Sequence, residues 1–333
     1  MPILGTSSSQ TASATRGNAT GIDAALLSNR DEYRPGVDAI GHAGLRAQEH
    51  VATQQRSCGS TECTSSFAMP WRNRRRPIFE AQWGCSGRCV LAIVRAALRR
   101  EQGERKSGVP VEPHRHRVPL GLVMLAQGWI THPQLQRALS QQRASGSGRI
   151  GDWLVSECGL ETEQVTRGLS VQWGCPVISM DGFSPVQMAL VMPRSFIEQF
   201  GMVPLRVAAS RLIYLGCADR PDASVAFAVE RMSGLKAEIG LVAAEHLEAA
   251  RDRLLECEAV STTVEAASDE DALAARVTAV LEQKQPLASR LVRLHQYYWL
   301  RIWLESGTKG KAGNVPVSDE DMQDYIFTIG ARA

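Results

Sequence analysis

The strongest constraint on the fold is a 24-residue unit that occurs twice, thirty residues apart. The first copy, at 119–142, reads PLGLVMLAQGWITHPQLQRALSQQ, and the second, at 149–172, reads RIGDWLVSECGLETEQVTRGLSVQ. A repeat of this length is one supersecondary unit used twice, so two equivalent surfaces should face each other or one shared ligand. The positions identical in the two copies are Gly121/Gly151, Gln134/Gln164, Arg137/Arg167, Leu139/Leu169, Ser140/Ser170 and Gln142/Gln172.

Each copy predicts a short helix, a turn at Gly128 or Gly159, and a longer helix. Helix and strand patterns then alternate through 173–256, with apolar strands at 202–209 and 211–218. Such an order predicts an α+β fold, in which the duplicated helical motif is followed by a small α/β sandwich.

The rest of the chain divides by composition. Residues 1–55 are rich in small polar side chains and predict disorder. We expect a cysteine module with a basic helix at 56–104, linkers at 105–117 and 257–268, two C-terminal helices at 269–306 and a tail at 307–333. The second of those helices carries an aromatic stripe, which fits either a partner-binding surface or a core packed on its own domain.

Residues 70–117 carry an excess of positive charge, with twelve Lys or Arg residues and only four acidic residues. This excess indicates either a solvated basic helix and linker or a nucleic-acid-binding segment. The sequence shows neither a secretory signal nor an apolar run long enough to span a membrane, so we expect a cytoplasmic protein.

Four cysteines form two close pairs, Cys58 with Cys63 and Cys85 with Cys89. Two such pairs can supply the four thiolates of a structural zinc site, although four unligated cysteines are the alternative. The segment PIFEAQWGCSGRC resembles treble-clef-like zinc fingers, in which a β-hairpin delivers cysteines to a helix. The other four cysteines lie in apolar contexts and predict ordinary core residues.

The repeat follows the pattern R-L-G-x-x-L-V-x-x-G, six residues, then L-x-x-x-L-x-x-Q. With the strand and turn LIYLGCADRPD, it resembles the N-terminal domain of type II secretion and type IV pilus ATPases (the GspE/MshE N-terminal family). The resemblance covers 118–256 and implies a docking domain for a protein partner, with secretion or pilus machinery as the candidate.

Some members of that family bind cyclic di-GMP through the paired motifs. Carried over to this chain, the resemblance implies a site at Gln142, Arg149, Gly151, Asp152 and Asp219. The first copy has Pro119 at the motif's Arg position, and Cys158 stands at a Gly position of the second. The same glycines and leucines also fit a purely structural role in helix packing.

No phosphate-binding loop, nucleophile elbow or zinc-protease motif occurs in this sequence. We therefore expect a non-enzymatic binding or regulatory protein that docks a partner and senses cyclic di-GMP. A zinc-finger regulator that binds nucleic acid through 70–117 is the alternative.

Overall fold

A computed structural model describes residues 58–64, 76–107, 117–209, 211–304 and 321–330. The predicted disordered segment at 1–55 and most of the linker at 105–117 lie outside these residues. So do four arginines of the basic segment, Arg72, Arg74, Arg75 and Arg115. Among the described helices, none combines the length and the apolar character that crossing a membrane requires.

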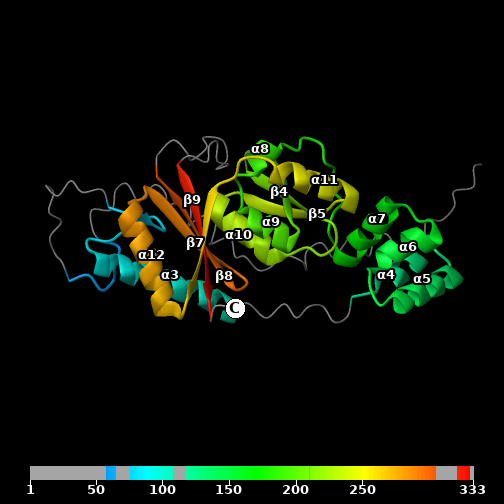
Figure 1. The fold of residues 1–333 in the computed structure, drawn as a ribbon, viewed down its shortest axis with the longest axis horizontal. Coiled ribbons are helices and arrows are strands. Elements are labelled where there is room, and N and C mark those ends of the chain that lie inside the picture. The colour runs from blue at the N-terminus through cyan, green and yellow to red at the C-terminus, as the bar shows by residue number, and fades with distance from the viewer. Residues whose placement is uncertain (1–57, 65–75, 108–116, 210, 305–320, 331–333) are drawn as a thin grey trace, which may run out of the picture. The chain divides into compact units, whose positions relative to one another are not determined.

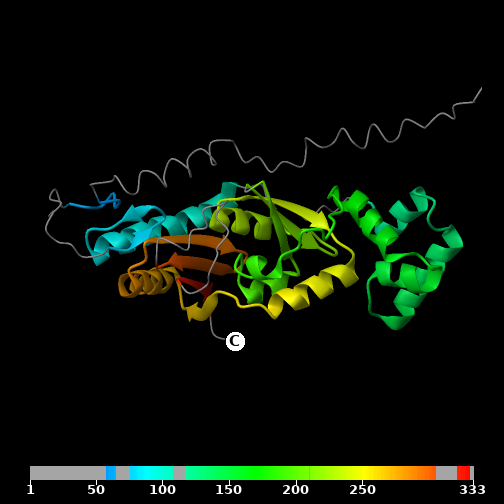
Figure 2. The ribbon, with the colours of Figure 1, turned by 90° about the horizontal axis from the view of Figure 1, so that it is seen from above.

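The two repeats fold into four helices that gather into one cluster (Figure 2). They are α4 (Leu120–Ala126), α5 (His132–Ser145), α6 (Ile150–Cys158) and α7 (Thr162–Trp173). Helix α4 packs on α7 and α5 packs on α6, so the short helix of each copy contacts the long helix of the other. A Cβ atom on Gly121 would lie 2.6 Å from Leu135, which explains why the motif needs glycine there.

The final glutamine of each copy holds the start of the other copy. The Gln142 side-chain amide donates to the carbonyl of Gly148 at 2.9 Å, directly before the second copy. The Gln172 amide donates to the carbonyl of Val118 at 2.9 Å, directly before the first. The two copies therefore exchange equivalent hydrogen bonds, as in a pseudo-two-fold pair.

The part that follows the repeats, residues 173–256, confirms the predicted α+β fold class. Its sheet has the order β3-β4-β5, with β3 antiparallel and β5 parallel to β4. Residues 175–180 add only an isolated bridge, between Val177 and Leu241. The elements are α8 (Pro185–Met188), α9 (Arg194–Phe200), β3 (Val203–Ala208), β4 (Leu212–Cys217), α10 (Ala223–Ser233), β5 (Lys236–Leu241) and α11 (Ala244–Leu255).

The C-terminal region corrects the sequence prediction. Helix α12 (Glu270–Lys284) is the first of the two helices expected at 269–306, but the second is a β-hairpin of β7 (Ala288–Leu294) and β8 (Tyr297–Trp303). The expected linker at 257–268 contains β6 (Ser261–Ala267), and the expected tail contains β9 (Met322–Ile329). These strands form a sheet in the order β6-β9-β8-β7.

The error at 288–303 has a physical cause. Residues 298–303 are all buried, because both faces of β8 are covered. A strand buried on both faces reads as a continuous apolar run, and such a run also satisfies helical spacing. His295, at a φ of +52°, and Gln296 form the two-residue turn that joins the strands. The aromatic side chains of this segment thus belong to a core, which is the second alternative that the sequence left open.

One face of the four-stranded sheet is covered by two helices from distant parts of the chain. Helix α3 (Gly87–Ser107) packs against α12 (Figure 1), and both contribute to one core with alternate residues of the strands. The opposite face carries Trp299 and Ile326, which join the core of the α/β part. The basic helix of the cysteine module is therefore part of the same folded unit as the C-terminal sheet.

A buried ion pair lies on that opposite face. Arg301 donates from Nε to Asp324 Oδ1 at 2.7 Å and from Nη2 to Oδ2 at 2.6 Å. Its Nη1 donates to the carbonyls of Leu190 and Val191, at 2.9 and 3.0 Å. The side chains of Arg301 and Asp324 are 3% and 0% exposed, and the Trp299 indole also donates to Asp324.

We expect Arg301→Ala to lower the free energy of unfolding by about 3–5 kcal/mol, because it leaves the Asp324 carboxylate buried without its partner. Chemical denaturation monitored by tryptophan fluorescence measures the change. Arg276→Ala, which removes an exposed pair with Glu265, is the control and should cost less than about 1 kcal/mol. Equal effects of the two substitutions would show that the buried pair contributes no more to the free energy of unfolding than the exposed pair does.

Candidate functional site

The cysteine module is built around a two-residue β-hairpin. Strand β1 (Ile78–Phe79) pairs with β2 (Gln82–Trp83), and the turn residues Glu80 and Ala81 have φ values of +49° and +61°. Two left-handed residues form the turn type that matches the twist of a tight hairpin. The hairpin ends just before Cys85, and α3 begins at Gly87, so Cys85 and Cys89 lie at the helix start.

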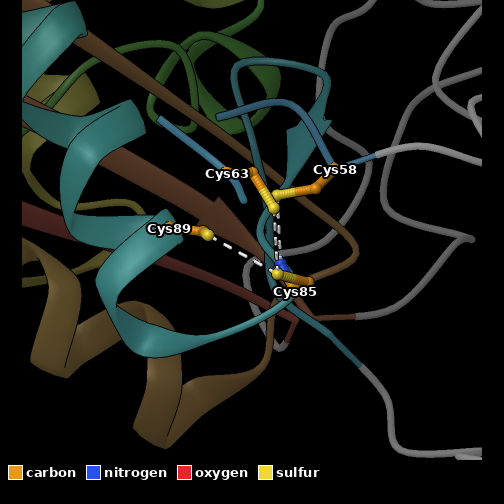
Figure 3. Close-up of side chains that lie close together, drawn as sticks. All are labelled: Cys58, Cys63, Cys85 and Cys89. Carbon is orange, nitrogen blue, oxygen red and sulfur yellow. Dashed lines mark hydrogen bonds between the residues drawn. The ribbon is translucent and has the colours of Figure 1, made fainter. Parts of the chain in front are cut away.

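The structure brings the four predicted ligands together. The Sγ atoms of Cys58, Cys63, Cys85 and Cys89 all lie within 4.8 Å of one another, and Figure 3 shows their side chains turned toward a common space. Cys85 Sγ lies 3.5 Å from the sulfurs of Cys63 and Cys89. In a tetrahedral site with metal–sulfur bonds of about 2.3 Å, the sulfurs are about 3.8 Å apart. The donor set and its spacing therefore fit a tetrahedral metal ion.

The surroundings shift the pKa values of two of these thiols in opposite directions. Burial, together with hydrogen bonds from neighbouring cysteines, raises the pKa of Cys85 to about 12. The hydrogen bond with Ser86 is the main reason that the pKa of Cys89 falls to about 7. Four thiolates at this distance repel one another, so a full thiolate set needs the positive charge of a cation.

The hairpin is fastened to the C-terminal sheet along β7. The amides of Ile78 and Glu80 donate to the carbonyls of Pro286 and Ser289, both at 3.0 Å. The Ser289 hydroxyl donates to the Ile78 carbonyl at 2.9 Å, and the Glu80 carboxylate accepts from the Leu291 amide at 2.7 Å. The hairpin that carries the cysteine cluster is therefore hydrogen-bonded to the C-terminal sheet, far along the sequence.

The residues predicted to hold cyclic di-GMP lie near the start of α6. Arg149 Nη1 is 3.5 Å from Asp219 Oδ2, and its Nε is 3.7 Å from Asp152 Oδ2. Asp219 follows β4, so residues seventy positions apart meet here, and all three side chains are about half exposed or more. Gly151 is buried, and its missing Cβ leaves room for Val165, so its role in this geometry is packing.

Arg220, which follows Asp219, connects the Arg149–Asp219 pair through Trp173 to a residue near the first copy. Arg220 lies 5.9 Å from the ring of Trp173, and Arg117 stacks over the same ring at 3.8 Å. Arg117 lies two residues before the first copy, and its Nη1 also donates to the Gln172 carbonyl. The loop after β4 therefore contacts Arg149 and Trp173, and Trp173 also contacts Arg117, so three arginines and two carboxylates gather here.

Trp173 and Arg220 were not among the predicted site residues. Trp173 follows the last glutamine of the second copy, at a position occupied by Arg143 after the first copy. This difference between the copies was the only signal in the sequence. Arg220 lies outside the repeat, so its approach depends on how β5, the neighbour of β4, packs on α7.

The basic segment gives no support to nucleic-acid binding where the structure describes it. Arg95 pairs with Asp271 at 2.9 Å, and Arg100 pairs with Glu80 and Glu101 at 3.5 and 3.1 Å. These cations hold α3 to its neighbours, so part of the positive charge is neutralised within the fold.

Comparisons with known proteins agree with the resemblance of the repeat. No protein-family model matches the chain. A stretch of 117 residues is 31% identical to the type IV pilus assembly ATPase PilB of Myxococcus xanthus (strain DK1622). The match covers 35% of this chain and 20% of that protein, so the chain spans about a fifth of the relative's length.

Two solved structures are similar to part of the chain at low identity. The structure of MshE with cyclic di-GMP is 21% identical, with a TM-score of 0.35, and the match covers 41% of this chain and 99% of that one. The N-terminal domain of XpsE is 20% identical, with a TM-score of 0.29, and the match covers 40% and 92%. The sequence match with a pilus ATPase agrees with the resemblance to the N-terminal domain of such ATPases that the repeat predicted.

Proposed function

We propose that this chain is a non-catalytic binding protein whose duplicated domain docks a protein of the pilus or secretion machinery. The observation that carries the proposal is the 31% identity with the pilus assembly ATPase PilB. The four-helix scaffold supports it, because the reciprocal bonds of Gln142 and Gln172 hold two equivalent helix pairs in fixed positions. A preorganised scaffold of this kind costs little ordering entropy when it binds.

The docking face that we propose is the start of the first copy. Val118 and Leu122 are 55% and 49% exposed there, and Pro119 between them is exposed as well. The equivalent residues of the second copy are Gly148, Arg149 and Asp152. The scaffold is shared, but one copy presents apolar side chains where the other presents charges, and exposed apolar side chains favour a protein partner.

Leu122→Asp gives the first copy the residue that the second copy has at this position. We expect it to weaken binding to a purified pilus-assembly component of the same organism by about tenfold or more, because a carboxylate would be desolvated at the interface. Biolayer interferometry measures the affinity. Val186→Asp, at a side chain that is 67% exposed on α8, is the matched control. Absence of binding by the unaltered chain to every such component argues against this function.

The second copy suits a different ligand. Arg149 and Asp219 meet at 3.5 Å, with Asp152 beside them, which supports cyclic di-GMP as a second candidate function. In such a site the guanidinium of Arg149 would pair with a phosphate and a carboxylate would read a guanine edge. Gln142 would act indirectly, since its amide holds the carbonyl next to Arg149.

We expect cyclic di-GMP to bind the full chain and Arg149→Ala to weaken binding about tenfold, which corresponds to a cation contact of about 1–2 kcal/mol. Isothermal titration calorimetry measures both affinities. Arg143→Ala, at an exposed arginine near the end of α5, should leave the affinity unchanged. If the unaltered chain gives no heat at high micromolar ligand, the nucleotide proposal is wrong while the docking proposal stands.

The metal that we propose for the cysteine cluster is zinc, in a structural role. Four thiolates in a closed tetrahedral set are typical of structural zinc, and the small hairpin has little apolar surface of its own. The ligands would be Cys58, Cys63, Cys85 and Cys89.

We expect about one zinc ion per chain in protein purified under reducing conditions, because the four sulfurs complete one tetrahedral site. Cys85→Ser should remove most of it and lower the melting temperature, since the hairpin would lose its anchor. Cys257→Ser, at a cysteine outside the cluster, should keep both the metal and the melting temperature. Metal analysis by mass spectrometry and thermal unfolding are the measurements, and a zinc content near zero in the unaltered chain refutes the assignment.

A further inference from the structure

One edge of the four-stranded sheet is covered by another segment of the chain, and the other edge is open among the described residues. The outer edge of β7 accepts the β1 hairpin through the amides of Ile78 and Glu80. At the other edge lies β6, which pairs with β9 and, within the described part of the chain, with no other strand. An open edge presents unpaired backbone groups and is a template for pairing with another chain.

Strand β6 lacks the features that usually protect an edge. Its sequence, Ser261–Ala267, contains no Pro or Lys, and its one charge, Glu265, pairs with Arg276 of α12 at 2.8 Å. Val264 is 64% exposed in the middle of the strand. An edge strand without Pro or Lys, whose one charge is paired within the chain and whose central β-branched side chain is exposed, is the kind of strand that pairs.

A shallow cleft lies beside this edge. Ala267 packs in the core beneath α12, so Thr262, Val264 and Ala266 point to the opposite face by strand alternation. On that face Thr262 and Val264 line a cleft of about 560 Å³, together with Val260 and Arg194. The open edge is thus accompanied by space for side chains from a second strand.

We propose that β6 pairs with β6 of a second copy of this chain, antiparallel and about a two-fold axis through Val264. This register places Val264 opposite Val264, Thr262 opposite Ala266, and Thr263 opposite Glu265. No charge then faces a like charge, whereas parallel pairing in register would place Glu265 beside Glu265. The strand is self-complementary, and a two-fold contact closes on itself instead of extending into a fibre.

The dimer joins two four-stranded sheets into one continuous sheet of twice the width. Both Val264 side chains then lie side by side on the cleft face, where each covers the other, and β-branched cross-strand pairs of this kind stabilise antiparallel strands. The hairpin of each copy still covers the far edge at β7, so both edges of the four-stranded sheet are then covered.

Sedimentation equilibrium of the full chain over a range of concentrations tests the proposal. We expect a reversible monomer–dimer equilibrium, and we expect Val264→Lys to weaken it about tenfold or more, because two ammonium groups would face each other. Val171→Lys, at a valine that is 48% exposed on α7, should leave the equilibrium unchanged. A monomer at every concentration, or an unchanged dimer of Val264→Lys, overturns the proposal.

Hydrogen exchange of the unaltered chain provides a test that needs no variant. We expect the amides of 261–267 to exchange more slowly as the protein concentration rises, since half of them gain partners only in the dimer. If their protection is the same at all concentrations, β6 is either open in solution or covered by another segment of the same chain, and the proposed pairing is wrong.

Discussion

The described core depends on the buried pair of Arg301 and Asp324. A guanidinium and a carboxylate can leave water only if every charged group finds a partner, and here both carboxylate oxygens and three guanidinium nitrogens do so. The pair joins neighbouring strands β8 and β9 directly opposite each other in the register. Through the carbonyls of Leu190 and Val191 it also fixes the segment before α9. A shift of either strand by one residue would leave a charge buried without its partner.

A second polar network ties the cysteine module to the same sheet. Glu101 of α3 is 4% exposed, and it lies 3.5 Å from Arg231 of α10 and accepts from the Arg293 amide. Glu80 of the hairpin reaches Arg100 and Arg231 as well. Segments at opposite ends of the chain therefore build one domain, and any metal bound by the cysteines would stabilise that domain and not only the hairpin.

The duplicated helices show how one scaffold can present two surfaces. The identical glutamines of the repeat perform internal tasks: Gln134 and Gln164 cap the long helices, and Gln142 and Gln172 hold the neighbouring copy. Leu122 and Asp152, which occupy equivalent positions and differ in character, are both exposed. Sequence comparison of the two copies could find the scaffold for this reason, because packing and capping restrict residue choice more than an exposed position does.

The sequence by itself determined the elements whose signals are local. These are the four repeat helices with their glycines and caps, the alternation of strands and helices from 193 to 255, and the two cysteine pairs beside a helix start. Only the tertiary structure decided that 288–303 is a hairpin, that α3 packs on it, and that Arg220 and Trp173 lie beside Arg149 and Asp219. These features depend on pairing between distant residues and on burial of both sheet faces, and neither leaves a periodic signal in the chain.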